Sequence, residues 1–463
     1  MMRSLFSGVA GLRTHQSRMD VIGNNIANVN TTGYKSQAMV FSDLMYQTTQ
    51  AASGANPVSG RGGVNARQIG LGSKTGAIKT AITNQGAAQS TNDGFDMMID
   101  GSSFFVVSDG QQNYFTRDGS FYVDGAGNLC MTSNGYTVMG WQVDQVTGEI
   151  TKGTVSPLRI MNDDTRFYSP EVTSQARIIG NVDKLDTDVT STNGRVMDLE
   201  FYDDAGYKYT AKLSVHEQSE GSGEQGKFTI QIDDILNANG KSIMYDGVDD
   251  QGNKKATDVK ATLGDASSTS NSVNLEFDPA DGTFRFVGAE GNSTFNLNVT
   301  GLPAMANHPI KIDCSTMTNV NTNGSSTCSA LKGTDTGDGT GRMQGERIGV
   351  TVQTDGKIYL SYSNGMSRLI GQIAVASFAN ASGLAKAGNN LYSATMNSGE
   401  FDGIGHDVTE DGGIINTGVL EMSNVELAQE FTEMITTQRG FQANSRIITV
   451  SDTLLEELTN LKR

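Results

Sequence analysis

The residues of this 463-residue chain that most often act as bases, nucleophiles or metal ligands are few and scattered. They follow none of the HExxH, HxH or CxxC spacings that bring two ligands to one metal. The chain also lacks a GxSxG nucleophile elbow and a GxxxxGK[ST] phosphate loop. The sequence therefore predicts no catalytic residue, no metal site and no cofactor at any of the following positions: His15, His216, His308, His406, Cys130, Cys314 and Cys328.

Two acidic tracts, "DGVDDQGN" (246–253) and "TDTGDGTG" (334–341), suggest calcium loops at first sight. Neither has the EF-hand order of alternating acids, a central Gly and a late Glu, so we interpret both as solvated turns. Cys314 and Cys328 could pair in an oxidising medium, but we favour buried thiols, because sparse cysteines are commonly buried as small apolar residues.

The composition limits the class of protein. The formal net charge of −17 argues against nucleic-acid binding, because affinity for phosphate backbones depends on Lys and Arg. No run of eighteen apolar residues occurs, so we expect no membrane insertion. The N-terminal "LFSGVAGL" is soon followed by Arg13 and His15 and is too broken for the apolar region of a secretory signal, so we expect that any export uses another route.

Both ends of the chain have the apolar spacing of three, four and seven residues that is typical of coiled-coil helices. Ser423 with Glu426 predicts a capping box at the start of the C-terminal helix. The residues at this spacing form a stripe along each helix, and we assign them as candidate assembly residues. They are Leu5, Val9, Leu12, Met19 and Ile26 in the first helix, and Leu427, Phe431, Met434, Gln438, Phe441, Ile448 and Leu454 in the second.

These helices have weak intrinsic stability. The first contains Gly8, Gly11 and Gly23, and a glycine in a helix interior costs about 1 kcal/mol relative to alanine. One interpretation is that the ends are poorly ordered in the free chain and form on meeting partners. The alternative is an intramolecular pair of N- and C-terminal helices docked on the body.

The stretch "ANVNTTGYKS" (27–36) ends the first helix with residues that cap or turn the backbone. We interpret it as a joint where the helix passes to the segment leading outward. Gly33 offers a left-handed exit without steric cost, and Tyr34 can anchor the emerging segment. The residues assigned to this joint are Asn28, Asn30, Thr31, Gly33 and Tyr34.

The remainder of the chain shows strand patterns separated by turn signals, apart from "SDLMYQTTQAA" (42–52), which suggests a short helix. We predict a mainly β fold with terminal α-helices, in a discontinuous, nested, multi-domain chain. The predicted parts are a coiled-coil inner domain (1–30 and 425–463), connecting segments (31–92 and 401–424), an inner β domain (93–145 and 346–400) and an outer β domain (146–345). Polar tracts at 233–271 and 309–341 interrupt the outer domain.

Several long stretches resemble the bacterial flagellar rod and hook family of axial proteins. At the ends these are "LFSGVAGLRTHQSRMDVIGNNIANVNTTGYKS" and "GVLEMSNVELAQEFTEMITTQRGFQANSRIITVSDTLLEELTNL". Between them, "GSSFFVVSDGQQNYFTRDGSFYVDGAGNLCMTSNGYTVMGW" and "NGMSRLIGQIAVASFANASGLAKAGNNLYSATMNSGE" resemble the family's shared β regions.

The resemblance implies a structural role without enzymatic activity. The large middle region, with "VNLEFDPADGTFRFVGAEGNSTFNLNVTG", favours a subunit of the hook, a curved flexible tube that acts as a universal joint between rod and filament. It implies self-assembly into a helical polymer, contacts with rod, hook cap and hook–filament junction proteins, and export without a cleaved signal by the flagellar type III apparatus to an extracellular hook. The alternatives are a distal rod subunit of the flagellar basal body or a secreted β-rich adhesin.

Overall fold

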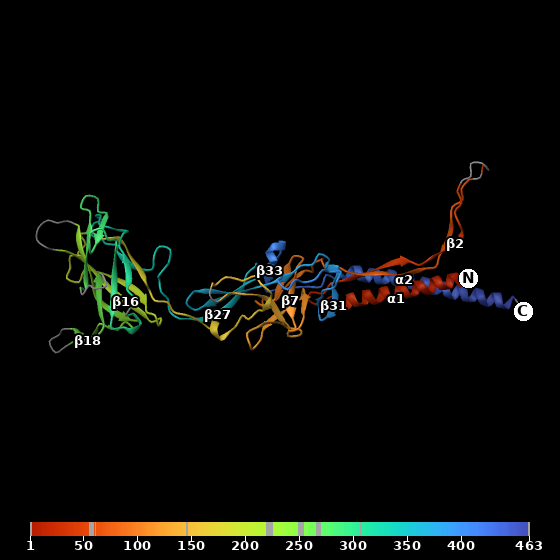
Figure 1. Ribbon diagram of the computed structural model, residues 1–463, viewed down its shortest axis with the longest axis horizontal. Coiled ribbons are helices and arrows are strands. Elements are labelled where there is room, and N and C mark those ends of the chain that lie inside the picture. The colour runs from red at the N-terminus through yellow and green to blue at the C-terminus, as the bar shows by residue number, and fades with distance from the viewer. Residues whose placement is uncertain are drawn as a thin grey trace. The chain divides into compact units, whose positions relative to one another are not determined.

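The computed structural model describes residues 2–54, 60, 62–144, 147–218, 226–248, 254–264, 270–305 and 308–461. The chain divides into two compact units, each described separately (Figure 1). Unit 1 comprises residues 1–162, 349–361 and 367–463, and unit 2 comprises residues 163–348 and 362–366. The chain thus leaves unit 1, builds unit 2 and returns. This nesting, with strands dominating and a helix near each end, confirms the predicted fold class. The finer division into four regions stays a prediction.

Unit 1 contains the helices α1 (Met2–Ala27) and α2 (Leu427–Asn460) and an antiparallel sheet with the order β28-β29-β11-β7-β8-β32-β31. Its strands are β1 (Gln37–Asp43), β2 (Tyr46–Gln50), β3 (Arg67–Gly70), β4 (Ser73–Thr80), β5 (Ala88–Ser90), β6 (Met97–Asp100), β7 (Phe104–Ser108), β8 (Asn113–Thr116), β9 (Phe121–Val123), β10 (Leu129–Met131), β11 (Thr137–Gln142), β12 (Ser156–Pro157), β28 (Lys357–Tyr362), β29 (Ser367–Ile373), β30 (Val375–Ala376), β31 (Ala385–Gly388), β32 (Leu391–Ser393), β33 (Ile414–Thr417) and β34 (Val419–Glu421). Short 3₁₀ turns are η3 (Ala381–Gly383) and η4 (Val408–Asp411).

The core of this sheet is aromatic. Phe104 and Phe115 lie fully buried beside Tyr392 and Ile82, and their rings meet Phe378 edge-on, an arrangement that aromatic pairs prefer. The order of the sheet joins strands that are far apart in the sequence. β32 pairs with β8, and β29 pairs with β11. The two crossings of the chain through unit 1 are therefore held together by a common sheet.

The short helix suggested for residues 42–52 is wrong. β1 pairs with β4, and β2 pairs with β3, so this segment forms extended two-stranded ribbons. The partner strands at 67–80 override the weak helical pattern, because strand formation depends on neighbours that the local sequence does not reveal.

Unit 2 is built from a five-stranded sheet, β15-β16-β17-β21-β22, and a six-stranded sheet, β20-β23-β24-β14-β25 with β26 on β14. Alternate side chains of both sheets enter one core, as in a β-sandwich. Its elements are η1 (Asp163–Thr165), β13 (Phe167–Tyr168), β14 (Gln175–Asn181), β15 (Arg195–Tyr202), β16 (Lys208–Glu217), β17 (Lys227–Asn237), β18 (Tyr245–Val248), β19 (Lys254–Ala256), β20 (Lys260–Gly264), β21 (Ser272–Phe277), β22 (Phe284–Val287), β23 (Thr294–Thr300), η2 (Pro303–Met305), β24 (Ile310–Asp313), β25 (Met317–Thr318), β26 (Ser329–Lys332) and β27 (Gly345–Val352), whose last residues belong to unit 1.

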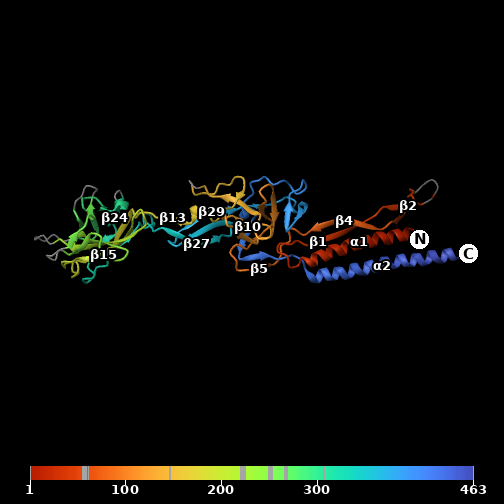
Figure 2. The ribbon, with the colours of Figure 1, turned by 90° about the horizontal axis from the view of Figure 1, so that it is seen from below.

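The helices α1 and α2 pack side by side and antiparallel (Figure 2). Ser4 lies beside Ser451 at one end of the pair, and Arg18 pairs with Glu433 at 3.0 Å further along. The helix pair therefore forms within one chain, which is the second of the two interpretations drawn from the sequence. No helix in the described part of the chain has the length and apolarity needed to cross a membrane.

Glycines explain how the helices approach each other. A Cβ atom on Gly11 would lie 2.8 Å from the Asn444 side chain, and one on Gly440 would lie 2.5 Å from the His15 ring. Gly23, in contrast, has no atom within 4 Å of such a Cβ. Gly11 of α1 and Gly440 of α2 are thus positions where any larger residue would require the facing Asn444 or His15 side chain to move.

The predicted capping box at Ser423 is wrong. α2 begins at Leu427, and Glu426 occupies the N-cap position without a side-chain cap hydrogen bond. The Ser423 hydroxyl instead accepts a hydrogen bond from Val425 N, outside the helix. The start of α2 is fixed by tertiary contacts of the preceding residues, which are part of the site described next.

Candidate functional site: a buried polar joint

The segment that follows α1 makes a tight turn against the sheet of unit 1. Asn28 Nδ2 donates to the Asn24 carbonyl at 2.9 Å, which satisfies one of the last carbonyls of the helix. Gly33 has φ of +66°, in the left-handed region that favours glycine. A Cβ there would lie 2.8 Å from Asp118 N, so the turn fits against the backbone at 117–118 only with glycine. Gly33 N donates to the Glu421 carbonyl at 2.7 Å.

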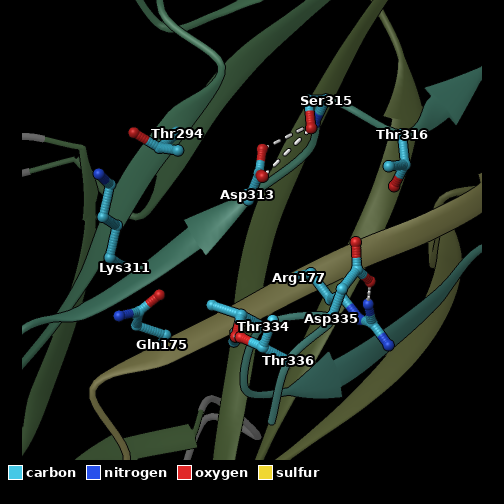
Figure 3. Close-up of a pocket in the computed structure, with 11 residues that line it drawn as sticks. Gln175, Arg177, Thr294, Lys311, Asp313, Ser315, Thr316, Thr334, Asp335 and Thr336 are labelled. Carbon is cyan, nitrogen blue, oxygen red and sulfur yellow. Dashed lines mark hydrogen bonds and ion pairs between the residues drawn. The ribbon is translucent and has the colours of Figure 1, made fainter. Parts of the chain in front are cut away.

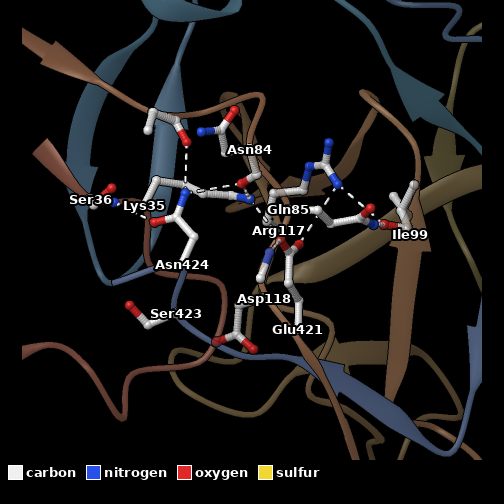
Figure 4. Close-up of polar contacts among 12 residues, drawn as sticks. Lys35, Ser36, Asn84, Gln85, Ile99, Arg117, Asp118, Glu421, Ser423 and Asn424 are labelled. Carbon is white, nitrogen blue, oxygen red and sulfur yellow. Dashed lines mark hydrogen bonds and ion pairs between the residues drawn. The ribbon is translucent and has the colours of Figure 1, made fainter. Parts of the chain in front are cut away.

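Two residues beyond this glycine, a lysine enters the interior. The side chains of Lys35, Arg117 and Glu421 are each only 1% exposed. Lys35 Nζ donates to Glu421 Oε1 at 2.6 Å and to the Asn84 carbonyl at 2.6 Å. Arg117 Nη1 lies 3.7 Å from Glu421 Oε2, and its guanidinium donates to the carbonyls of Ile99 and Gly101 (Figure 4). We call the cluster of Asn25, Gly33, Tyr34, Lys35, Arg117, Glu421 and Asn424 the polar joint.

Burial dominates the electrostatics of the polar joint. It lowers the pKa of Lys35, although the Glu421 carboxylate opposes this shift, and it lowers the pKa of Arg117. Burial also raises the pKa of the neighbouring Asp118 carboxyl. The Glu421 carboxylate therefore compensates the buried, desolvated charges of Lys35 and Arg117. Removing one member of such a buried group costs far more stability than breaking an ion pair on the surface.

Two asparagines connect this cluster to both helices. Asn25, fully buried in α1, donates from Nδ2 to Glu430 Oε1 in α2 at 2.8 Å, and its Oδ1 accepts from the Tyr34 hydroxyl at 3.3 Å. Asn424, just before α2, accepts from Ser36 N at 2.7 Å and donates to the carbonyls of Ala81 and Asn84. The end of α1, the approach to α2 and the segment at 81–86 are thus held at one point.

The other joint residues predicted from the sequence lie around the same turn. Thr31 donates through its hydroxyl to Asn28 Oδ1 at 3.1 Å, and Asn30 is exposed. Tyr34 is buried, with the Lys386 ammonium 4.8 Å from its ring centroid. The structure therefore places Tyr34 against its own chain; a role as a joint between the layers of a polymer stays a prediction.

The predicted assembly residues divide into two groups. Leu5, Leu12, Met19, Ile26, Met434, Phe441 and Ile448 are partly buried, whereas Val9, Leu427, Phe431, Gln438 and Leu454 are exposed. At the glycines between α1 and α2, the facing side chains are Asn444 at Gly11, His15 at Gly440, and Ile447 and Ile448 at Gly8. The apolar stripe of α2 is therefore largely free in the single chain.

Sequence reasoning missed Lys35, Arg117 and Glu421. A lone charged residue near a turn or strand normally indicates solvent exposure, because unpaired charges are rarely buried. Nothing in the local pattern links three residues so far apart in the chain.

The histidines and cysteines form no reactive group that we can identify in the described ranges. His406 Nε2 lies 2.7 Å from Asp411 Oδ2, and the Ser103 hydroxyl lies 2.9 Å from the same oxygen. A catalytic triad has the histidine between the serine and the carboxylate, whereas here the carboxylate lies between the serine and the histidine. The three cysteines are buried free thiols. No cluster of metal-ligating side chains occurs among the described residues, and most of the tract 246–253 lies outside them.

Three family models match separate segments of the chain. They are "Flagella basal body rod protein" at residues 5–35, "Flagellar hook protein FlgE/F/G D1 domain" at 98–164 and "Flagellar basal body rod FlgEFG protein C-terminal" at 416–461. Each segment contributes one charged residue to the polar joint, respectively Lys35, Arg117 and Glu421. The joint is thus where the three matched segments meet.

Full-length similarity extends to curated proteins. The chain is 35% identical to the flagellar hook protein FlgE of Treponema pallidum and 35% identical to that of Borreliella burgdorferi, with 100% of each chain covered. It is 28% identical to the flagellar basal-body rod protein FlgG of Bacillus subtilis, again over 100% of both chains. A solved structure of Helicobacter pylori flagellar hook protein FlgE2 matches with a TM-score of 0.42 and 14% identity, covering 72% of this chain and 100% of the other.

Proposed function

The chain belongs to the flagellar hook protein family, and we propose that it is the structural subunit of a flagellar hook, a self-assembling tube that transmits torque while it bends. The observation that carries this proposal is the 35% identity over full length to two flagellar hook proteins. The role is mechanical, and we propose no catalytic activity for it.

The helix pair supplies the physical basis for assembly. Large apolar side chains remain exposed along α2, among them Phe431 at 50%, Ile435 at 59%, Val450 at 57% and Leu454 at 50%. An uncovered apolar stripe of this length is a surface for association, because burying it removes apolar area from water. When many copies bury it head to tail, the contacts generate a helical polymer.

The polar joint gives the subunit a rigid base for these helices. Because Asn25 joins α1 to Glu430 of α2, and Asn424 joins the approach to α2 to the segment at 81–84, we propose that force carried by the helices passes through the polar joint into the β structure of unit 1. We propose that the helices form the inner tube, that the β regions form outer layers, and that the subunit contacts rod, cap and junction proteins at the ends of the hook. Export by the flagellar type III apparatus without signal cleavage, to the outside of the cell, belongs to the same proposal.

The second candidate is a rod subunit of the flagellar basal body, which the 28% identity to a rod protein favours to a lesser degree. Both candidates are axial polymers, so they share the first test. A secreted adhesin is the candidate that assembly would exclude.

Deletion of residues 1–24 or 428–463 tests the proposal while keeping Asn25, Lys35, Glu421 and Asn424. We expect the purified full chain to sediment as polymer at high concentration, whereas either deletion stays monomeric with unit 1 folded, as monitored by the single tryptophan, Trp141. Polymer formation by both truncated chains would contradict the assignment of assembly to the terminal helices.

A further inference from the structure

A polar notch of about 280 Å³ on unit 2 is balanced in charge. Two cations, Arg177 and Lys311, line it together with two carboxylates, Asp313 and Asp335 (Figure 3). Arg177 forms an ion pair with Asp335, and Asp313 accepts hydrogen bonds from the backbone N and the hydroxyl of Ser315. The notch therefore carries no net charge, in contrast to the surroundings of a titratable group between the helices of unit 1.

This group is His15 of α1, which lies between α2 and the ribbon of β1 and β4. Its ring faces Gly440 of α2, where an added Cβ would be 2.5 Å from the ring. The ring of Phe41 in β1 meets it nearly at a right angle, with 5.4 Å between the ring centroids. The adjacent Thr14 hydroxyl donates to the Ser73 carbonyl of β4 at 3.2 Å. His15 thus lies where α1 contacts both α2 and the ribbon.

The environment of the ring suits its neutral form. The Nδ1 atom of His15 is buried and has no hydrogen-bond partner among the residues that the structure describes. A neutral imidazole can leave this nitrogen without a proton and carry its proton on Nε2, whereas an imidazolium carries a proton on both nitrogens. Protonation would therefore place an N–H donor of a charged group in a buried position without an acceptor, which costs free energy.

The charged groups around the ring add to this cost. Burial lowers the pKa of His15, and the cation of Arg18, one turn further along α1, lowers it as well. Glu433 of α2 already pairs with Arg18 at 3.0 Å, so this carboxylate gives little compensation to a second cation. The other charged residues next to these contacts are exposed, and they are Arg439 of α2, Asp43 of β1 and Lys74 of β4.

We propose that His15 makes the pairing of α1 with α2 depend on pH. The closed pair holds the ring in its neutral form, whereas the open pair exposes the ring to water, where it can take up a proton. The closed pair is therefore fully stable above the ordinary histidine pKa of about 6.5 and loses stability as pH falls below it. Because α2 also carries the proposed assembly surface, loosening the pair in acid would oppose assembly.

Hydrogen exchange in the purified full-length chain tests this inference, because protection of the amides at 11–18 and 437–444 reports opening of the pair. A proton that only the open pair accepts can lower the protection factor by at most about tenfold between pH 7.5 and 5.5. After correction for intrinsic exchange rates, we expect a severalfold fall in wild type and nearly constant protection in His15→Gln. His308→Gln is the control; it removes an exposed histidine of unit 2 and should keep the wild-type pH dependence.

An NMR titration of the wild-type chain gives a second readout that does not depend on the stability of the variant. The chain has four histidines, and the Cε1 proton signals of His15 and His308 are assigned by their absence from the two variants. We expect the His15 signal to titrate at lower pH than the His308 signal.

Three results would overturn the inference: equal pH dependence of exchange in wild type and His15→Gln, no protection of either helix at pH 7.5, or a His15 signal that titrates at the same pH as His308 or higher. Neither measurement requires a polymer, so failure of the chain to polymerise would refute the proposed function alone.

Discussion

Replacing Glu421 with glutamine is the sharpest perturbation of the polar joint. The new side-chain amide keeps an oxygen that can accept from Lys35 and from Gly86 N, so the hydrogen bonds survive and the change removes charge alone. Two cations with 1% exposed side chains, Lys35 and Arg117, would then have lost the carboxylate that they share, and the Asp100 carboxylate would still act on Arg117. Breaking a buried pair by removing one partner costs about 3–5 kcal/mol, and we expect that loss in the unfolding free energy of unit 1.

Trp141, the only tryptophan, is buried in unit 1, so its fluorescence in denaturant reports this unit selectively. Lys35→Met leaves Arg117 facing Glu421 one to one and should cost less, about 1–3 kcal/mol for the lost hydrogen bonds. Lys357→Gln, which breaks the partly exposed pair with Asp355 at 2.8 Å, is the control and should cost under about 1 kcal/mol.

The pH dependence supplies a second signature. Burial lowers the pKa of Lys35 in the folded chain, so the folded state releases this proton at a lower pH than the unfolded state does. The penalty for the charged lysine is present at neutral pH and is relieved as pH rises toward the unfolded pKa of lysine. The loss of unfolding free energy in Glu421→Gln, relative to wild type, should therefore become smaller at alkaline pH. A loss equal to that of Lys357→Gln at all pH values would refute the reasoning.

Gly33→Ala should destabilise unit 1 by about 2 kcal/mol or more, because φ is positive at this position and the added Cβ would lie 2.8 Å from the backbone nitrogen of Asp118. Gly23→Ala is the control and should be neutral or stabilising, because a Cβ there has no atom within 4 Å. Unfolding in denaturant followed by Trp141 fluorescence measures both variants, and equal losses of stability would contradict the close-packing argument. Asp183 in unit 2 accepts from the amides of Leu185, Thr322 and Gly324, and these hydrogen bonds hold its pKa below the usual value. Its stabilisation is therefore present above about pH 4 and lost as pH falls through the lower folded pKa. In Asp183→Asn, hydrogen exchange at the Thr322 and Gly324 amides should be faster than in wild type at neutral pH, after correction for intrinsic exchange rates. The protection factors of variant and wild type should become equal in acid. Unchanged protection at neutral pH would show that the Asp183 carboxylate does not hold this loop.

The sequence was informative where a pattern is local. The period of three and four residues located both terminal helices, and the Asn-rich turn with Gly33 marked the end of the first one. Alternating strands and the long middle region predicted a nested β-rich chain. These features follow from backbone preferences and hydrophobic periodicity, which a single segment displays without its neighbours.

The failures concern tertiary partners. Residues 42–52 pair with strands that follow some twenty to thirty residues later, and the start of α2 is set by Asn424 reaching Ser36, Ala81 and Asn84. Gly11 was interpreted as lowering the stability of the first helix, yet a Cβ atom there would lie 2.8 Å from the Asn444 side chain of α2. Lys35 and Glu421 are separated by 386 positions, and only the folded chain shows that they share one buried site.

Electron microscopy of polymer grown from the purified full chain tests the central claim most directly. The proposed function predicts a hollow tube whose inner wall consists of α1 and α2, with the apolar stripe at Phe431, Val450 and Leu454 buried between copies. A polymer in which these helices face outward, or a chain that remains monomeric under all conditions of concentration and salt, would contradict it.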